Sequence, residues 1–150
     1  MKKHYLFILI VMGILIFGSC ATTYQYVYLP DQDKKLEDSS LVGIYVMRPA
    51  FLGTAISMQV KENDSLIGST GPKSFLCWET TPEEKILLSK SENTSKITIP
   101  AEKGNVYYVH QHVLMGMLYA RNSLELINDE QRGQKLLSKC KPPVVKTDKK

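Results

Sequence analysis

Short apolar runs that alternate with polar positions fill most of this chain. Between residues 41 and 127 these runs are separated by turn-forming residues such as Pro49, Asn63 and Gly104. Alternation at a period of two is typical of a strand with one buried face. The pattern predicts strands over residues 41–48, 55–62, 65–69, 74–79, 85–91, 95–100, 106–115 and 123–127.

Seven or eight short strands at this spacing, with turn signals between them, are typical of an antiparallel β-sandwich. Residues 130–139 form the last periodic segment, contain Leu136 and Leu137, and predict a short C-terminal helix, with Gly133 as an unfavourable residue inside it. Residues 22–29 place tyrosines at alternate positions and form either a further strand or an aromatic belt at a membrane surface. The expected fold class is all-β.

The first twenty residues follow a different pattern. Met1-Lys2-Lys3 precedes an apolar run that extends to Phe17, and Gly18-Ser19-Cys20 closes it. The run is shorter than the roughly twenty apolar residues that a membrane span needs. This order of basic start, apolar run and small residues predicts a lipoprotein signal peptide that is cleaved before Cys20. The Cys20 thiol would then carry a diacylglyceryl group and its amine a third acyl chain, anchoring the protein without spanning the membrane.

One domain accounts for the mature chain of about 130 residues. The predicted organisation is a signal peptide (1–19), a lipidated N-terminus and tether (20–40), a β-sandwich domain (41–141) and a disordered basic tail (142–150). The net charge of +4 includes Lys2 and Lys3, which leave with the signal, so charge favours no particular partner. The tail lysines are expected to be solvated, with contact to anionic lipid or cell-wall polymer as the alternative.

Cys77 and Cys140 remain as an even pair once Cys20 carries lipid. An exported protein enters a compartment that permits disulfides, so a Cys77–Cys140 bridge is one interpretation. The other is a buried free Cys77, since cysteine behaves as a small apolar residue. The sequence leaves both open because it does not give the separation of the two Cα atoms.

His110 and His112 are two residues apart on a predicted strand, so both rings lie on one face. They are candidate metal ligands, and a zinc site would need a third from Glu125, Cys77 or another carboxylate. The alternative is a pair of partly exposed strand histidines without an ion, and no metal or cofactor is assigned on two ligands. Arg48, at the end of a strand, is expected to pack its stem and keep its guanidinium in water, with anion binding as the alternative.

The most apolar segment outside the signal is 113–119, which contains Met115, Gly116 and Met117. Methionine clusters adapt to varied partners, so the segment is either an exposed contact surface or a bend that Gly116 permits. No Gly-x-Ser-x-Gly elbow, His-Glu-x-x-His motif or phosphate-binding glycine loop occurs in the sequence. These features predict a protein that is not an enzyme.

Two motifs of the chain are Gly43-Ile44-Tyr45-Val46-Met47-Arg48-Pro49 and Gly104-Asn105-Val106-Tyr107-Tyr108-Val109. Both resemble motifs of a known family of bacterial lipoproteins, which is catalogued as domain of unknown function 2846. The resemblance covers residues 41–141. It implies a compact all-β domain behind a lipoprotein signal, and it carries over no catalytic residue.

The predicted function is that of a lipid-anchored, non-catalytic binding or structural protein of the bacterial cell envelope. Its expected partners are the membrane, through acyl chains on Cys20, and an envelope protein or cell-wall polymer; nucleic acid is excluded by compartment. Ala21 replaces the aspartate that retains lipoproteins in the inner membrane of enteric bacteria, which favours the periplasmic face of the outer membrane. The alternative is a small-ligand or metal-binding lipoprotein that uses His110 and His112; an envelope hydrolase ranks third.

Overall fold

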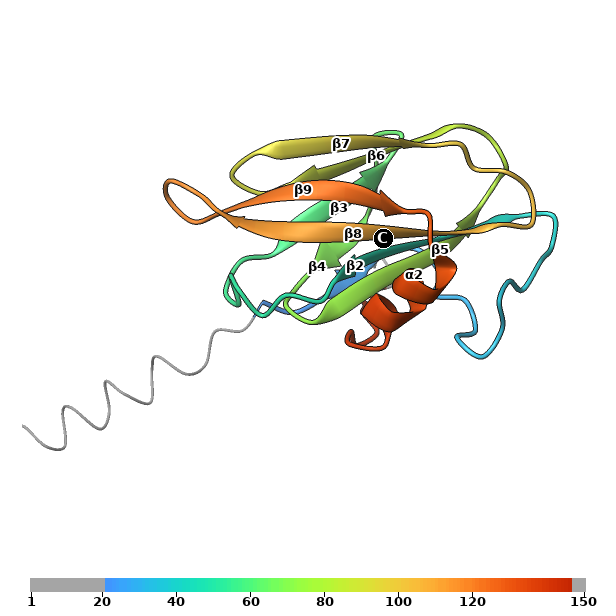
Figure 1. The fold of residues 1–150 in the computed structure, drawn as a ribbon, viewed down its shortest axis with the longest axis horizontal. Helices are drawn as coiled ribbons and strands as arrows, with labels where there is room; N and C mark the ends of the chain where they lie inside the picture. The colour runs from blue at the N-terminus through green and yellow to red at the C-terminus, as the bar shows by residue number, and fades with distance from the viewer. Residues whose placement is uncertain (1–20, 147–150) are drawn as a thin grey trace, which may run out of the picture.

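A computed structural model describes the fold of residues 21–146 (Figure 1). Within this range ten strands form two sheets that pack face to face, and one helix lies outside them. The predicted all-β sandwich with a short C-terminal helix is therefore confirmed. The predicted signal peptide, Cys20 and the last four residues of the predicted tail lie outside the described residues.

The larger sheet has the strand order β10-β1-β4-β3-β6-β7, and the smaller sheet has the order β5-β2-β8-β9. The strands are β1 (Tyr24–Gln25), β2 (Val42–Arg48), β3 (Met58–Glu62), β4 (Ser65–Thr70), β5 (Ser74–Thr80), β6 (Lys85–Lys90), β7 (Thr94–Ile99), β8 (Val106–Met115), β9 (Ala120–Ile127) and β10 (Val144–Val145). The helix is α2 (Glu130–Leu137). The eight longer strands are those that the sequence pattern predicts.

Strand pairing is mainly antiparallel, as predicted, but two strand pairs run in parallel. β2 pairs with β8 in parallel, with Gly43 opposite Val106, and β1 pairs with β10 in parallel. The chain crosses from β7 in the larger sheet to β8 in the smaller one, and β8 starts at the same end of the sandwich as β2. Periodicity along one strand carries no information on its neighbour's direction, so the sequence did not indicate this pairing.

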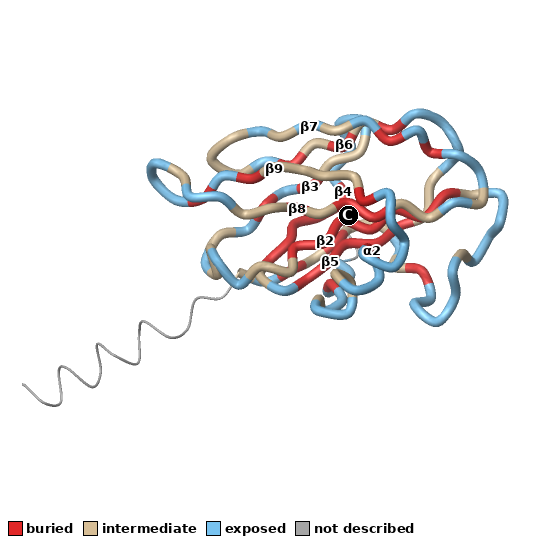
Figure 2. Tube along the Cα trace, viewed as in Figure 1, coloured by how far each residue is buried: buried red, intermediate tan, exposed pale blue. Residues whose placement is uncertain are grey.

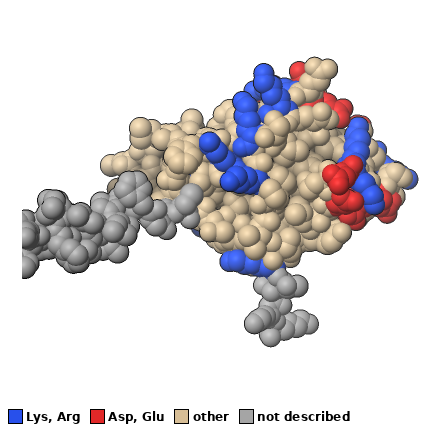
Figure 3. Space-filling view, turned by 90° about the horizontal axis from the view of Figure 1, so that it is seen from below, with Lys and Arg blue, Asp and Glu red and all other residues tan. Residues whose placement is uncertain are grey.

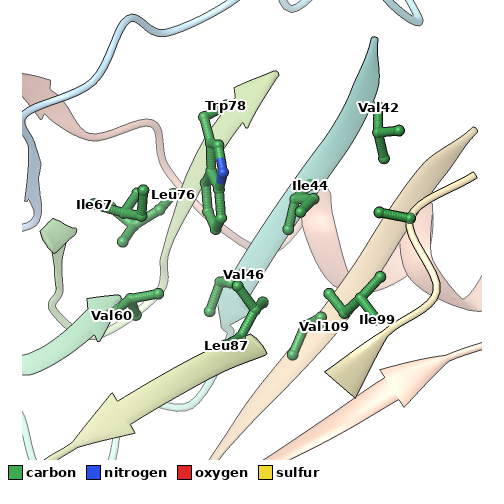
Figure 4. Close-up of a cluster of buried hydrophobic side chains, with 11 residues drawn as sticks. Val42, Ile44, Val46, Val60, Ile67, Leu76, Trp78, Leu87, Ile99 and Val109 are labelled. Atoms are coloured by element: carbon green, nitrogen blue, oxygen red, sulfur yellow. The ribbon is translucent and has the colours of Figure 1, made fainter. Parts of the chain in front are cut away.

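The main core lies between the two sheets (Figure 4). Its buried members come from strands of both sheets and include Val46, Trp78, Leu87 and Val109. A second cluster on the outer face of the smaller sheet includes Tyr45, Phe75 and Tyr108 and is covered by α2. All seven residues of β2 are buried for this reason, because one face meets the other sheet and the opposite face meets the helix (Figure 2).

Two segments outside the predicted domain boundaries belong to the larger sheet. Gln25 in β1 is fully buried, and its side chain donates to the carbonyl oxygen of Cys77 at 3.0 Å and accepts from the Cys77 N–H at 3.1 Å. Val144 and Val145 form β10 beside β1. The strand interpretation of residues 22–29 is thus confirmed at Tyr24–Gln25, and residues 144–145 of the predicted tail form a strand that no periodic pattern indicated.

The turns follow the expected chemistry. Asn63 and Asp64 connect β3 to β4 with φ values of 44° and 71°, which confirms the predicted hairpin turn. Asp129 precedes α2, and its side chain accepts hydrogen bonds from the backbone N–H groups of Gln131 and Arg132. This cap sets where the helix begins, and it thereby places Arg132 over the outer face of β9.

Candidate functional site

Two histidines of β8 lie on the outer face of the smaller sheet, beside α2. Val109 and Gln111 alternate with them and point into the sandwich, where Val109 joins the core and Gln111 is fully buried. His110 pairs with Glu125 of β9 across the ladder. The register of β8 and β9 therefore places the Glu125 carboxylate beside the two imidazoles. Glu125 is one of the third ligands considered from the sequence.

The three side chains are in contact. Nε2 of His112 lies 2.6 Å from Oε2 of Glu125, and Nδ1 of His110 lies 3.9 Å from the same oxygen. The two imidazole rings have centroids 3.7 Å apart and are tilted by 38°. Nδ1 of His110 is buried and makes no hydrogen bond. A buried nitrogen without a hydrogen-bonding partner marks a place where a ligand would satisfy an unmet interaction.

Arg132 of α2 completes the cluster, and the sequence analysis had not identified it. Its guanidinium donates to both oxygens of Glu125, with Nη1 at 2.9 Å from Oε1 and Nη2 at 3.4 Å from Oε2. This bidentate contact fixes the orientation of the Glu125 carboxylate beside the histidines. No sequence pattern indicates this contact, because α2 reaches β9 only through its tertiary packing on the smaller sheet.

The surroundings determine which members of the cluster carry charge. Burial, followed by the neighbouring His112, lowers the pKa of His110 to about 4, against an ordinary value of 6.5. The hydrogen bond from His112 and those from Arg132 hold the pKa of Glu125 below its usual value. At neutral pH the site therefore presents a neutral imidazole at His110 and an ionised carboxylate at Glu125, which are the protonation states that bind metals.

The donor set fits a divalent transition metal. His110, His112 and Glu125 each offer one ligand atom, and these atoms lie within 4.8 Å of one another. Zinc holds nitrogen and oxygen ligands at about 2.0–2.2 Å in a tetrahedron, so its ligand atoms are roughly 3.3 Å apart. To bind zinc, Nδ1 of His110 would have to move slightly closer to Oε2 of Glu125 than 3.9 Å, and Nε2 of His112 would have to move away from its 2.6 Å contact with that oxygen. Water would be the fourth ligand. Two imidazoles and one carboxylate are a recognised zinc donor set.

The other predicted site residues lie elsewhere. Cys77 in β5 is buried, Cys140 follows α2, and both are free thiols in the structure. They pack in the cluster between α2 and the smaller sheet, which separates Cys77 from the histidine site. In the structure Cys77 is a buried free thiol and Cys140 packs in the same cluster, so a Cys77–Cys140 bridge stays a prediction.

Arg48 does not keep its guanidinium in water, and that prediction was wrong. The side chain is fully buried. Its Nη1 donates to the carbonyl oxygens of Ile56 at 2.6 Å and Thr70 at 3.1 Å, and its Nη2 donates to those of Leu52 at 3.2 Å and Gly53 at 2.7 Å. The loop after β2 folds back over the strand end and supplies three of these four acceptors. Arg48 therefore has a structural role in holding this loop. The alternative, anion binding, would need an exposed guanidinium, and that of Arg48 is buried.

Comparisons with known proteins give one distant relative. The chain is 29% identical over 98 residues to an uncharacterized protein of Haemophilus influenzae, a match that covers 65% of this chain and 58% of the relative. The chain thus matches less than two thirds of that relative's length. No family model and no solved structure match the chain. Within residues 21–146 no helix has the length and apolar character that crossing a membrane requires.

Proposed function

We propose that the protein is a lipid-anchored lipoprotein of the bacterial cell envelope whose β-sandwich is a non-catalytic binding module. The order of basic start, apolar run and Gly18-Ser19-Cys20 is the observation that carries the proposal. The resemblance to the lipoproteins of domain of unknown function 2846 supports it. Acyl chains on Cys20 would hold the domain at the periplasmic face of the outer membrane, with an envelope protein or cell-wall polymer as its partner.

Membrane fractionation of a Cys20→Ser variant tests this anchor. The unmodified protein is expected in the membrane pellet, and Cys20→Ser is expected to retain its signal peptide, because the diacylglyceryl acceptor is lost. Cys140→Ser is the matched control, since it removes a thiol from the same chain and leaves the cleavage site intact. Equal processing and equal fractionation of all three proteins would contradict the anchor.

A second function rests on a separate observation. Nδ1 of His110 is buried without a hydrogen bond and lies 3.9 Å from the Glu125 carboxylate that His112 also contacts. This arrangement supports binding of one Zn²⁺ ion by His110, His112 and Glu125, with water as the fourth ligand. Arg132 would then act as a competitor for the Glu125 oxygens, because its charge opposes the charge of the ion.

Calorimetric titration of the purified lipoprotein in detergent with Zn²⁺ tests this second function. We expect one ion per chain, and no binding in a His110→Ala, His112→Ala double variant. Arg132→Gln is expected to bind more tightly, since it frees Glu125 and removes a positive charge from the site. Mg²⁺ should not compete, because it prefers oxygen ligands. Binding that survives the double variant, or an unmodified protein without affinity for Zn²⁺, would reject the site.

A further inference from the structure

Exposed apolar side chains gather at one end of the sandwich. This end, which we call the proximal end, is formed by the loops 49–57, 71–73, 91–93 and 116–119. Seven large apolar side chains are exposed on its loops and strand ends: Phe51, Leu52, Leu114, Met115, Met117, Leu118 and Tyr119. They include the most exposed apolar side chains of the described residues, with Met117 at 93% and Met115 at 83%. An apolar patch of this size on a small domain marks a contact surface.

The two loops that carry the patch adjoin each other. Leu52 and Ile56 of the first loop and Leu114, Met115 and Tyr119 of the second line one apolar hollow of about 240 Å³. The first loop is held from within by Arg48, which donates to the carbonyl oxygens of Leu52, Gly53 and Ile56. The patch is therefore a defined surface of the fold.

The second loop is also fixed, although its apolar side chains point into solvent. The Glu92 carboxylate accepts hydrogen bonds from three successive backbone N–H groups, those of Met117 at 2.9 Å, Leu118 at 3.2 Å and Tyr119 at 3.0 Å. These bonds hold the pKa of Glu92 below its ordinary value. The Glu92 carboxylate is thus hydrogen-bonded to the loop backbone, and the side chains of Met117 and Leu118 remain at the outer surface of the loop.

The described chain begins at this same end. The backbone N–H of Ala21 donates to the carbonyl oxygen of Thr54 at 2.7 Å, which ties the first described residue to the first apolar loop. Cys20 is bonded directly to Ala21. Acyl chains on Cys20 would therefore leave the domain beside the apolar patch, with no linker between them.

Charge is divided between the two ends. Glu92 is the single acidic residue in the four proximal loops, whereas the loops at the opposite, distal end carry Asp31, Asp33, Glu37, Asp38, Asp64, Glu83, Glu84, Glu102 and Asp129. Lys73 lies over the Phe51 ring at 5.5 Å, and Lys141 is bonded to the backbone of Lys73. On the face shown in Figure 3, the acidic side chains lie at the right and none appears at the left. Anionic lipid would attract the proximal end and repel the distal end.

We propose that the proximal end is seated on the bilayer that holds the Cys20 acyl chains, with the side chains of the 116–119 loop in the interface and the acidic distal end directed away from it. This inference rests on the proposed lipid anchor. The acyl chains provide retention. The apolar patch and Lys73 provide orientation, so that the domain stands on the membrane in one pose.

A fluorescent label at each end tests this orientation. The lipoprotein is reconstituted into vesicles of phosphatidylethanolamine and phosphatidylglycerol, with or without a lipid that carries a nitroxide quencher on its acyl chain. Met117→Cys labels the proximal loop and Asp33→Cys labels the distal end, both in a Cys140→Ser background that leaves the buried Cys77 as the remaining thiol of the described residues. Both substituted positions are exposed, and the Met117 backbone N–H that Glu92 holds is unchanged.

We expect the label at position 117 to lose about half of its fluorescence to the nitroxide lipid, because interfacial side chains enter to about 5–10 Å. The label at position 33 should lose little. Equal, weak quenching at both positions in protein that floats with the vesicles would overturn the inference and leave the anchor intact. A label at 117 that is shielded from water but not quenched would show a second copy or another protein on the patch, which also overturns it. Protein that does not float with the vesicles refutes the anchor itself.

Discussion

The guanidinium Nη2 of Arg48, a fully buried side chain, donates a hydrogen bond to the carbonyl oxygen of Gly53 at 2.7 Å. Three further carbonyl oxygens accept from the same side chain. Hydrogen bonds from a charged donor are stronger than neutral ones, and buried carbonyl groups are costly when left without a donor. The residue therefore connects the end of β2 to the proximal apolar loop.

Arg48→Met should destabilise the fold, because methionine fills much of the volume but leaves the carbonyl oxygens unpaired. We expect the free energy of unfolding to fall by about 3 kcal/mol or more. Urea unfolding followed by circular dichroism measures this change. Arg121→Met is the control, since Arg121 is exposed on β9. Equal unfolding midpoints for the two variants would show that the buried hydrogen bonds do not stabilise the loop.

Gly133→Ala separates two physical effects of opposite sign. Alanine is favoured over glycine in a helix interior by about 1 kcal/mol. At this position, however, the added Cβ would meet the side chain of Tyr108 at 2.5–2.9 Å. We expect overpacking to dominate, with a net loss of about 1–3 kcal/mol in the free energy of unfolding.

Thermal unfolding of Gly133→Ala beside Gln131→Ala, an exposed position of the same helix, measures this balance. A Gly133→Ala, Tyr108→Leu double variant should recover part of the loss, because the smaller side chain makes room for the Cβ. Stabilisation by Gly133→Ala alone would mean that α2 does not lie so close to β8.

The fold should lose stability as the pH falls from about 6.5 to about 4. The pKa of His110 is lowered to about 4 in the folded protein, whereas the unfolded chain protonates this residue at its ordinary value of 6.5. The unfolded state therefore binds more protons in this window, and stability falls as the pH is lowered through it. Below about 4.5 the lowered pKa of Glu125 adds a loss of the same sign.

Chemical unfolding at a series of pH values measures this dependence, with His110→Gln as the comparison. The variant lacks the titrating imidazole, so its stability should vary less between pH 6.5 and pH 4 than that of the unmodified protein. Titration of His110 by NMR reports the same pKa directly. An imidazole that titrates near 6.5 would contradict the buried position of His110.

The two described cysteines should react slowly with alkylating agents while the protein is folded. Burial raises the pKa of both thiols to about 11. Because the thiolate is the reactive form, alkylation at pH 8 is expected to be on the order of a hundredfold slower than for an ordinary cysteine. Iodoacetamide labelling with and without denaturant measures the ratio. Rapid labelling of the folded protein, or thiols that need a reductant before they react in denaturant, would contradict the free, buried thiols.

Periodicity predicted where the strands run, and it could not predict how they pair. The eight longer strands lie close to their expected ranges because each has a buried face that repeats every second residue. Residues 22–29 were a candidate strand, but the sequence could not indicate its short length or its partner, since β1 is placed by the close approach of Tyr24 to Gly68 on β4, where a Cβ would clash with the Tyr24 carbonyl. Such backbone contacts are visible only in three dimensions.

Part of the candidate site could also be predicted from strand periodicity. His110 and His112 share a face by their spacing alone, and Glu125 entered as one of several acids on the chain. The register of β8 and β9 selected Glu125, and the position of α2 added Arg132. Arg48 was assigned to the surface because charged residues rarely lose all contact with water. The loop after β2 folds back over the end of that strand and supplies carbonyl oxygens that accept from Arg48, so the guanidinium is buried instead.

The lipid anchor is measured by mass spectrometry of the N-terminal peptide of the protein isolated from its native membrane. We expect a chain that begins at Cys20 and carries a diacylglyceryl group on the sulfur, with a further acyl chain on the amine. A peptide that retains the residues before Cys20, or a Cys20 with an unmodified thiol, would contradict it.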